Sequence, residues 1–321
     1  LTMPNYNGVW SLTTQLQYNT DWQADNVSLA RVFAAGIGMW LGGASNSVVI
    51  DTVNITSAGN ATDFGDLIVG TYGSGAVGST TRGVISGTSS GNNMQYVTFA
   101  TAGNSTDFGD STVTNNRGGG GSSSIRGLFF GGGDGGTAIG DVVDYITIAS
   151  TGDATDFGDL VGDRRADGAG FASPTRAIYG GGGASGTTRY NTIDYFTINS
   201  AGNATDFGDL SAGKEGPNGC ASTTRGLFAG GNGAGPSYDV IEYITISSTG
   251  DVTDFGDLIE DEVPNMNGCT TNQTTAVMHS TGNTIQTVTI ASTADATDFG
   301  DLTVSRSNRT SATGNLHGGI A

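Results

Sequence analysis

The chain has 321 residues and a net charge of −18, and 55 of its residues are glycine. Such a negative chain repels phosphate backbones at long range, so its charge disfavours binding to nucleic acid. Its apolar stretches are only a few residues long, far short of the roughly 20 residues that cross a bilayer as a helix, so the sequence predicts no membrane insertion. The glycines follow no triplet period and there are only 5 prolines, which excludes collagen.

Residues 5–29, near the start of the chain, contain Thr20-Asp21-Trp22, an imperfect copy of a pentapeptide that recurs further along. The pentapeptide is Thr-Asp-Phe-Gly-Asp, and its six copies begin at Thr62, Thr106, Thr155, Thr205, Thr253 and Thr297. Successive copies are 44, 49, 50, 48 and 44 residues apart. A period in the forties is typical of propeller blades or solenoid units, and it argues against the disorder that a composition rich in Gly, Ser and Thr would otherwise suggest.

The pentapeptides define six repeat units. In chain order they span approximately 30–68, 69–112, 113–161, 162–211, 212–259 and 260–303. In the fifth unit, a small-residue segment at 219–222 is followed by a Gly-containing segment at 224–231. A segment rich in β-branched and aromatic residues follows at 240–246, and the pentapeptide segment follows at 253–258. Gly, Ser and Asp residues suited to turns separate these segments, and no stretch has a sustained helical period. The unit therefore reads as four short strands, which fits a propeller blade better than a solenoid coil.

Each strand has an expected place in the blade. The small-residue strand should be innermost, because strands from every blade crowd together at the axis. The second and third strands should carry the apolar residues that pack between blades. The fourth, outer strand presents a repeated phenylalanine, which should fill the space against a neighbouring blade: Phe64, Phe108, Phe157, Phe207, Phe255 and Phe299. An aspartate precedes each one: Asp63, Asp107, Asp156, Asp206, Asp254 and Asp298.

The two ends of the chain bear on how the ring closes. Residues 304–321 resemble the start of another unit, and the first unit's own inner strand is expected near residues 31–34. We therefore expect a single all-β domain over residues 1–321, a β-propeller with seven four-stranded blades. Its last blade would be split between residues 304–321 and 5–29, which would remove free sheet edges. Six blades with loosely packed ends is the alternative.

The strand order resembles the kelch motif. Diglycines carry this likeness, at Gly42-Gly43, Gly131-Gly132, Gly180-Gly181, Gly230-Gly231 and Gly318-Gly319, although Phe stands where kelch repeats usually have Trp. More specifically, the segment from Ile193 to Leu210 resembles kelch-like repeats of tail-fibre and other virion proteins of marine bacteriophages. The segment from Gly8 to Trp22 resembles a leader found before such repeats. The resemblance implies a virion surface protein that meets the host, with no named receptor.

The aspartates of the repeat have two interpretations. Pairs such as Asp156/Asp159 and Asp206/Asp209 could each bind Ca²⁺ together with nearby carbonyl groups. Alternatively, one aspartate accepts hydrogen bonds from turn amides while the other is solvated. The structural interpretation is favoured, because six copies on six blades would not converge into one site. We therefore assign neither a metal nor a cofactor, with Ca²⁺ as the alternative.

The cysteines and histidines are few. Cys220 and Cys269 both follow Asn-Gly and are assigned the same position in successive units. Equivalent Cα atoms of neighbouring blades are expected to lie too far apart for a disulfide, which needs about 4.4–6.8 Å, so we predict two free, buried thiols. His279 and His317 fall at similar places in consecutive units. No cluster of carboxylates accompanies them, so a metal site there is not favoured.

Four arginines each precede a second strand: Arg82, Arg126, Arg176 and Arg225. In an acidic protein we expect them to pair with aspartates or stack on aromatic rings, with recognition of phosphate or an acidic glycan as the alternative. No combination of residues indicates catalysis: Asp-Phe-Gly appears without the other kinase motifs, and no nucleophile elbow or zinc-protease motif is present. The sequence therefore predicts a protein that is not an enzyme.

Divergent loops at residues 86–94, 133–141 and 183–192 stand out from the repeated scaffold, and loops on a rigid frame often carry binding function. We therefore expect a virion-surface or extracellular protein, a tail-fibre or tail-tip propeller that recognises a host cell-surface glycan or protein and contacts other virion proteins. Two alternatives stay open. One is a structural virion decoration or assembly protein, and the other is a secreted bacterial adhesin or matrix subunit.

Overall fold

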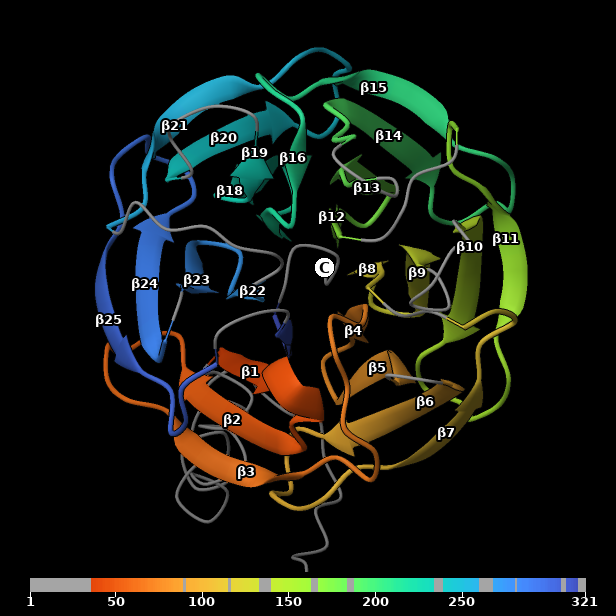
Figure 1. Cartoon of the computed structure of the whole chain (residues 1–321), viewed down its shortest axis with the longest axis vertical. Helices are drawn as coiled ribbons and strands as arrows, with labels where there is room; N and C mark the ends of the chain where they lie inside the picture. The colour runs from red at the N-terminus through yellow and green to blue at the C-terminus, as the bar shows by residue number, and fades with distance from the viewer. Residues whose placement is uncertain are drawn as a thin grey trace, which may run out of the picture.

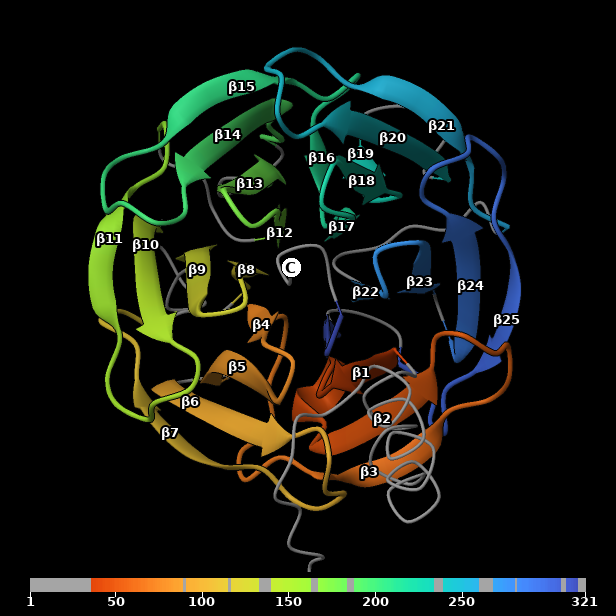
Figure 2. The same ribbon diagram turned by 180° about the vertical axis from the view of Figure 1, so that it is seen from behind.

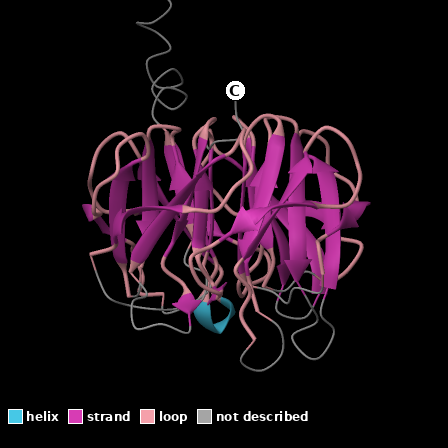
Figure 3. Ribbon diagram, turned by 90° about the horizontal axis from the view of Figure 1, so that it is seen from above, coloured by secondary structure: helices cyan, strands magenta, loops and turns pink. Residues whose placement is uncertain are grey.

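The computed structural model describes residues 36–88, 91–114, 117–132, 140–162, 167–183, 188–233, 239–259, 268–280, 282–306 and 310–316. These residues form an all-β propeller of six blades, each a four-stranded antiparallel sheet, arranged around a central axis (Figures 1 and 2). Seen from the side, the strands run between the two faces of a disc (Figure 3). No helix in this described part of the chain is long and apolar enough to cross a membrane.

The blades are numbered in chain order, and the strands of each blade are named from the axis outward. The first blade is β26 (Ser311–Gly314), β1 (Ile37–Leu41), β2 (Val49–Asn54) and β3 (Thr62–Asp66). The second is β4 (Ala76–Gly78), β5 (Arg82–Thr88), β6 (Gly91–Thr98) and β7 (Thr106–Asp110). The third is β8 (Gly119–Ser122), β9 (Arg126–Gly132), β10 (Gly140–Thr147) and β11 (Thr155–Asp159).

The remaining three blades follow the same plan. The fourth is β12 (Gly168–Ala172), β13 (Arg176–Gly181), β14 (Thr192–Thr197) and β15 (Thr205–Asp209). The fifth is β17 (Asn218–Ala221), β18 (Arg225–Ala229), β20 (Val240–Thr245) and β21 (Thr253–Asp257). The sixth is β22 (Cys269–Thr271), β23 (Thr275–His279), β24 (Thr284–Thr289) and β25 (Thr297–Asp301). A separate ribbon pairs β16 (Lys214–Glu215) with β19 (Asn232–Gly233), and a 3₁₀ turn, η1, spans Ala44–Asn46.

The ring closes through the C-terminal strand, so the six-blade alternative is confirmed and the expectation of a seventh, split blade is wrong. Strand β26 pairs antiparallel with β1, with Gly314 opposite Gly38 and Ser311 opposite Leu41. The last segment therefore supplies the inner strand of the first blade and does not start a new blade. Without it, β1 would present an unpaired edge to the axis. The other half of the expected split blade, residues 5–29, and the inner strand expected at 31–34 both lie outside the described residues.

The inner strands consist mostly of small residues, glycine among them, because they converge at the axis. Their order around the ring is β26, β4, β8, β12, β17 and β22. A Cβ atom added to Gly121 of β8 would lie 2.8 Å from the carbonyl oxygen of Phe171 in β12. A Cβ on Gly170 of β12 would lie 2.8 Å from a backbone atom of Gly120. The backbones of adjacent blades thus approach so closely here that larger residues do not fit.

The apolar core is divided into clusters that lie between blades. One cluster joins Phe108 of the second blade to Phe129 and Ile146 of the third. Another joins Phe157 of the third blade to Tyr179 and Phe196 of the fourth. The repeated phenylalanines all lie on the outermost strands, and all six are buried. Each blade therefore covers apolar surface that its neighbour could not cover alone, which favours a closed ring.

Candidate functional site

The two faces of the disc are built from different connections. One face carries the turns between first and second strands and between third and fourth strands; we call it the repeat face. The other carries the connections between second and third strands and from each blade to the next; we call it the loop face. Figure 3 shows η1 on the loop face, at the bottom of the view.

Connections on the repeat face have constant length. The first-to-second turn has three residues in all five blades in which those strands follow one another in sequence, as between Gly78 and Arg82. The third-to-fourth turn has seven residues in all six blades, as between Asn54 and Thr62. On the loop face, the second-to-third connection ranges from two residues, between Thr88 and Gly91, to ten, between Gly181 and Thr192. Variation is therefore confined to the loop face.

A serine fixes the short turns of the repeat face. In the second blade, the Ser79 hydroxyl accepts the backbone N–H of Arg82 at 3.1 Å, and Ser123, Ser173 and Ser222 make the equivalent bond in the next three blades at 3.0–3.1 Å. These hydroxyls satisfy turn amides that would otherwise face solvent. Each of these turns thus delivers an arginine at the start of the second strand.

The four arginines stack on aromatic rings, which confirms the stacking interpretation. Their guanidinium carbons lie 4.2–4.7 Å from ring centroids, in the pairs Arg82–Tyr96, Arg126–Tyr145, Arg176–Tyr195 and Arg225–Tyr243. Each arginine also donates a hydrogen bond to a backbone carbonyl of the following blade. The acceptors, at 2.9–3.0 Å, are Ala149, Ile198, Ile246 and Ile290. These arginines therefore bind neighbouring blades together, and their observed partners are rings and carbonyls instead of aspartates.

The repeated aspartates lie on the outer rim. The first aspartate of each pentapeptide is exposed, from Asp63 in β3 to Asp298 in β25. The last one lies beside the turn of the next blade, and the contact is made by its backbone. Asp66 receives the Ser105 N–H on its carbonyl oxygen at 2.8 Å, and its own N–H donates to the Asn104 side chain at 3.0 Å.

This rim contact recurs at all six boundaries between blades. Each side-chain acceptor belongs to the turn of the following blade, at Asn104, Asp153, Asn203, Asp251, Asp295 and Asn60. The last of these joins Asp301 of the sixth blade to the first blade. The expectation that an aspartate side chain of the pentapeptide accepts the turn amides is therefore not met at these boundaries: the side-chain acceptor is an Asn or Asp of the turn itself.

The described residues do not show a calcium site made of grouped acidic side chains. Among them, no group of three or more His, Cys, Asp or Glu residues is arranged to hold a metal ion. The pKa of Asp257 is raised by burial, which is the larger cause, and by the nearby charges of Asp239, Asp295 and Asp254. Mutual repulsion between carboxylates thus adds to desolvation at this part of the rim.

A ring of buried polar residues in the third strands was missed by the sequence analysis. It consists of Asp51, Gln95, Asp144, Asp194, Glu242 and Gln286, all at most 2% exposed. In five blades the side chain accepts a backbone N–H from the connection that arrives from the preceding blade. The donors are Val69, Thr112, Val161, Ser211 and Ile259, at 2.8–3.2 Å. A signal was present, because each of these residues precedes the first aspartate of its pentapeptide by 12 positions.

Two acidic residues of this buried ring form ion pairs with basic side chains. Glu242 accepts a hydrogen bond from Lys214 at 2.7 Å, and Asp51 pairs with Arg306 at 2.9 Å. Arg306 also donates to the carbonyl oxygen of Gly42 at 2.6 Å. Burial lowers the pKa of the Arg306 guanidinium, while Asp51 opposes this shift. The Arg306 pair joins the chain after the sixth blade to the first blade, so it forms part of the ring closure.

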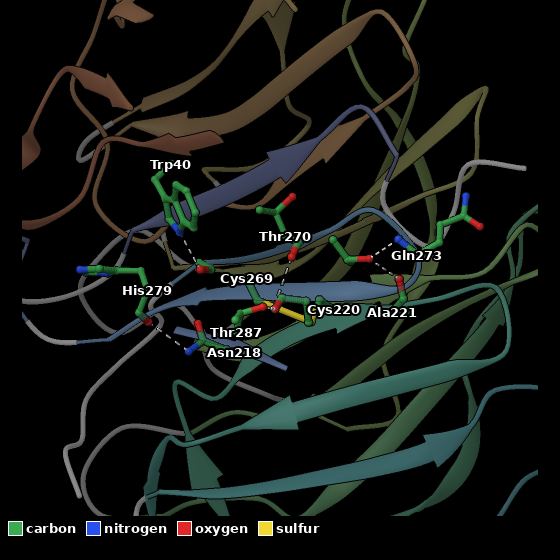
Figure 4. Close-up of a disulfide and its surroundings, with 12 residues drawn as sticks. Trp40, Asn218, Cys220, Ala221, Cys269, Thr270, Gln273, His279 and Thr287 are labelled. Atoms are coloured by element: carbon green, nitrogen blue, oxygen red, sulfur yellow. Dashed lines mark hydrogen bonds between the residues drawn. A yellow bond between two sulfur atoms is a disulfide. The ribbon is translucent and has the colours of Figure 1, made fainter. Parts of the chain in front are cut away.

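The two cysteines form a disulfide, so the prediction of two free thiols is wrong (Figure 4). The bond joins Cys220 of β17 to Cys269 of β22, with Cα atoms 5.6 Å apart. Adjacent inner strands lie closer together at the axis than we expected. Among the described residues, no cysteine is free.

His279 is a buried residue of the sixth blade. It is fully inaccessible, and its Nε2 atom lies 3.1 Å from the Gly282 carbonyl oxygen. Burial lowers its pKa to about 4, and the nearby Arg306 contributes to the shift. His317, its expected counterpart, lies outside the described residues. His279 therefore acts as a neutral core residue at ordinary pH.

The loop face carries an additional polar cluster over the fourth and fifth blades. Arg189 donates to the Asn232 side chain at 3.0 Å, and its Nε atom lies 3.9 Å from a carboxylate oxygen of Glu215. These residues lie on or beside the β16–β19 ribbon, and they are partly exposed. Of the expected divergent loops, residues 86–94 are mostly the strands of a tight hairpin, whereas 133–139 and 184–187 lie outside the described residues.

The geometry thus gives one face of uniform turns and one face of varied connections with a polar cluster. No family model and no curated protein matches the sequence.

Proposed function

We propose that this propeller is a non-enzymatic binding protein of a virion surface, which attaches to a host cell-surface glycan or protein through its loop face. The main support for the proposal is that the connections on the two faces differ in how much their length varies. Repeat-face turns keep three or seven residues, whereas the second-to-third connections of the loop face vary from two to ten. Variation confined to one face of a rigid scaffold is typical of a recognition surface.

The chemistry of the loop face supports this assignment. Arg189, Glu215 and Asn232 offer partly exposed donors and acceptors of the kind that bind sugar hydroxyls or a polar protein surface. Exposed aliphatic side chains accompany them, with Ile68 57% and Ile259 48% accessible. The virion setting comes from the resemblance of the repeat to phage kelch-like proteins. The absence of a catalytic motif in the sequence supports a role in binding.

The test is binding of purified, labelled protein to host cells, together with protection of those cells from infection. We expect saturable binding that the Ile68→Arg/Ile259→Arg variant reduces at least tenfold. The matched control is Ile125→Arg, which places the same charge at an aliphatic position, 67% exposed, on the repeat face. The control should bind like the wild type.

Two results would overturn the proposal. One is an absence of saturable binding to any host cell, and the other is an equal loss of binding in both variants. Association with other virion proteins in the absence of cells would instead indicate a decoration or assembly role.

A further inference from the structure

A groove of about 600 Å³ lies between the first and second blades on the repeat face. It lies beside the third-to-fourth turns, on the face opposite the loops proposed above to bind the host. Its walls include Ile37, Thr52 and Phe64 of the first blade and Phe99, Ala100 and Ala102 of the second. This volume is typical of pockets that bind small molecules or side chains.

The first blade lacks two residues that stand beside the equivalent space in four other blades, and its groove is larger than the cavity of about 460 Å³ beside the same turn of the fifth blade. In the second blade, Arg82 lies opposite Thr98 and stacks on Tyr96. In the first blade, Ile37 lies opposite Asn54 at the position of Arg82, and Thr52 stands at the position of Tyr96. Both replacements are shorter side chains, and neither can form the stack.

The exposure of the repeated phenylalanines reflects the same difference. Tyr96 covers Phe108 edge to face, with ring centroids 6.0 Å apart, and Phe108 is only 2% exposed. Phe64 has no tyrosine over it, and at 7% it is the most exposed of the six. Phe299 in the sixth blade, where Thr287 replaces the tyrosine, is next at 4%. The missing ring therefore opens the groove down to the Phe64 side chain.

The groove also retains the hydrogen-bond acceptors of the filled sites. Arg82 donates to the carbonyl oxygen of Ala149 at 2.9 Å and approaches that of Ile148 at 3.5 Å. The equivalent carbonyls beside the groove are those of Phe99 and Ala100. No donor in the described part of the chain is bonded to either of them. A guanidinium group from another molecule could therefore donate hydrogen bonds to these two carbonyl oxygens, as Arg82 does in the second blade.

We propose that this groove binds an arginine side chain presented, next to an aromatic residue, by a partner protein. Four other blades of this chain bind an arginine of their own between a ring and a carbonyl, so the site is built for a planar guanidinium with apolar contact. The net charge of −18 attracts a basic partner, whereas it would repel a second copy of this chain. Lysine fits less well, because its ammonium group cannot stack as a plane.

The probe for this proposal is the blocked dipeptide acetyl-tyrosyl-arginine amide, titrated into the full chain by calorimetry or by amide NMR. We expect saturable binding that shifts the amide signals around Phe99 and Ala102. The matching dipeptide with citrulline, which keeps the shape of arginine and removes its charge, should bind at least tenfold more weakly. Equal binding of the two probes would overturn the assignment to a guanidinium.

Two variants test the location. Ile37→Arg/Thr52→Tyr gives the first blade the stack of the second, and it should abolish binding while leaving the protein folded. Ala102→Trp obstructs the groove from an exposed turn position and should have the same effect. Its matched control is Ala201→Trp, at the equivalent turn of the fourth blade, where Arg126 and Tyr145 already occupy the space. Unchanged binding in the first two variants, or no saturable binding to the wild type, would overturn the proposal.

Discussion

Cys220 and Cys269 are offset by one residue within their blades, and this offset brings their side chains together. Cys220 lies opposite Leu227 in its blade, whereas the residue at that level in the next blade is Thr270, opposite Val277. Cys269 is one position earlier. Successive side chains of a strand point to opposite faces of the sheet, so Cys220 points towards the sixth blade and Cys269 points back towards the fifth.

Cysteines at equivalent positions would both point in the same direction around the ring and could not meet. The offset is visible in the sequence: Cys220 and Cys269 are 49 residues apart, whereas the second strands that follow them start 50 residues apart, at Arg225 and Thr275. The shared Asn-Gly-Cys tripeptide therefore does not mark one structural position in the two blades.

We expect the disulfide to stabilise the ring. Closing a loop of this length restricts the unfolded chain and contributes about 2–4 kcal/mol. The Cys220→Ala/Cys269→Ala variant should lose about that much free energy of unfolding, measured with urea under oxidising conditions. Adding a reductant should lower the stability of the wild type and leave that of the variant unchanged. A non-reducing mass that lacks the loss of two hydrogens would contradict the bond itself.

The arginine stacks should contribute to cohesion between blades. Arg176→Ala removes a cation–π contact and a charge-assisted hydrogen bond to Ile246, and the site is partly exposed, so a loss of about 1–2 kcal/mol is expected. Tyr195→Phe keeps the ring and should change stability by less than half of that. Equal effects of the two substitutions in urea unfolding would show that the stacked ring is not what holds the arginine.

The ion pair at the ring closure should be far more sensitive than an exposed one. Arg306→Ala would leave the carboxylate of Asp51 buried without its cation, which costs about 3–5 kcal/mol. Arg189→Ala, beside the partly exposed Glu215, should cost less than about 1 kcal/mol. Amide exchange should locate the damage: β1 and β26 lose protection first in Arg306→Ala. Uniform loss of protection around the ring would argue against a local role in closure.

How far the sequence predicts this molecule depends on whether a feature repeats within the chain. The four-strand blade, its inner strand of small residues and the outer phenylalanines follow from local patterns that recur along the chain. The number of blades does not follow from such patterns, because it depends on the pairing of β26 with β1, two segments that are at least 270 residues apart. Local strand propensity is the same whether the last strand completes the first blade or starts a seventh.

The candidate sites were harder to predict for a related reason. The buried ring from Asp51 to Gln286 could have been found from its constant spacing to the pentapeptide. The groove could not, because the arginine and the tyrosine that the first blade lacks belong to different strands. Recognising it requires the register that places Ile37 and Thr52 on the same side of one blade.

The repeated aspartates should not depend on calcium. The rim is held by backbone hydrogen bonds and by Asn or Asp side chains of the turns, as at Asp66 and Asn104. We therefore expect the melting temperature to stay within about 1 °C when EDTA is added or when millimolar Ca²⁺ replaces it. A rise of several degrees with Ca²⁺ and not with Mg²⁺ would restore the calcium interpretation for the outer strands.

Acid should weaken the sixth blade through His279. Its pKa is lowered to about 4 in the folded state, from 6.5 for an unperturbed imidazole, so the unfolded chain binds the extra proton between these two pH values. The stability that comes from keeping His279 neutral is complete above pH 6.5 and is lost as the pH falls towards 4, by up to about 3 kcal/mol.

Carboxylates change their charge mainly below pH 5, so the effect of His279 on stability is best measured between pH 5 and 7. In this window the free energy of unfolding of the wild type should rise with pH, and that of His279→Gln should rise less steeply. Parallel curves for the two proteins would show that His279 does not carry the effect.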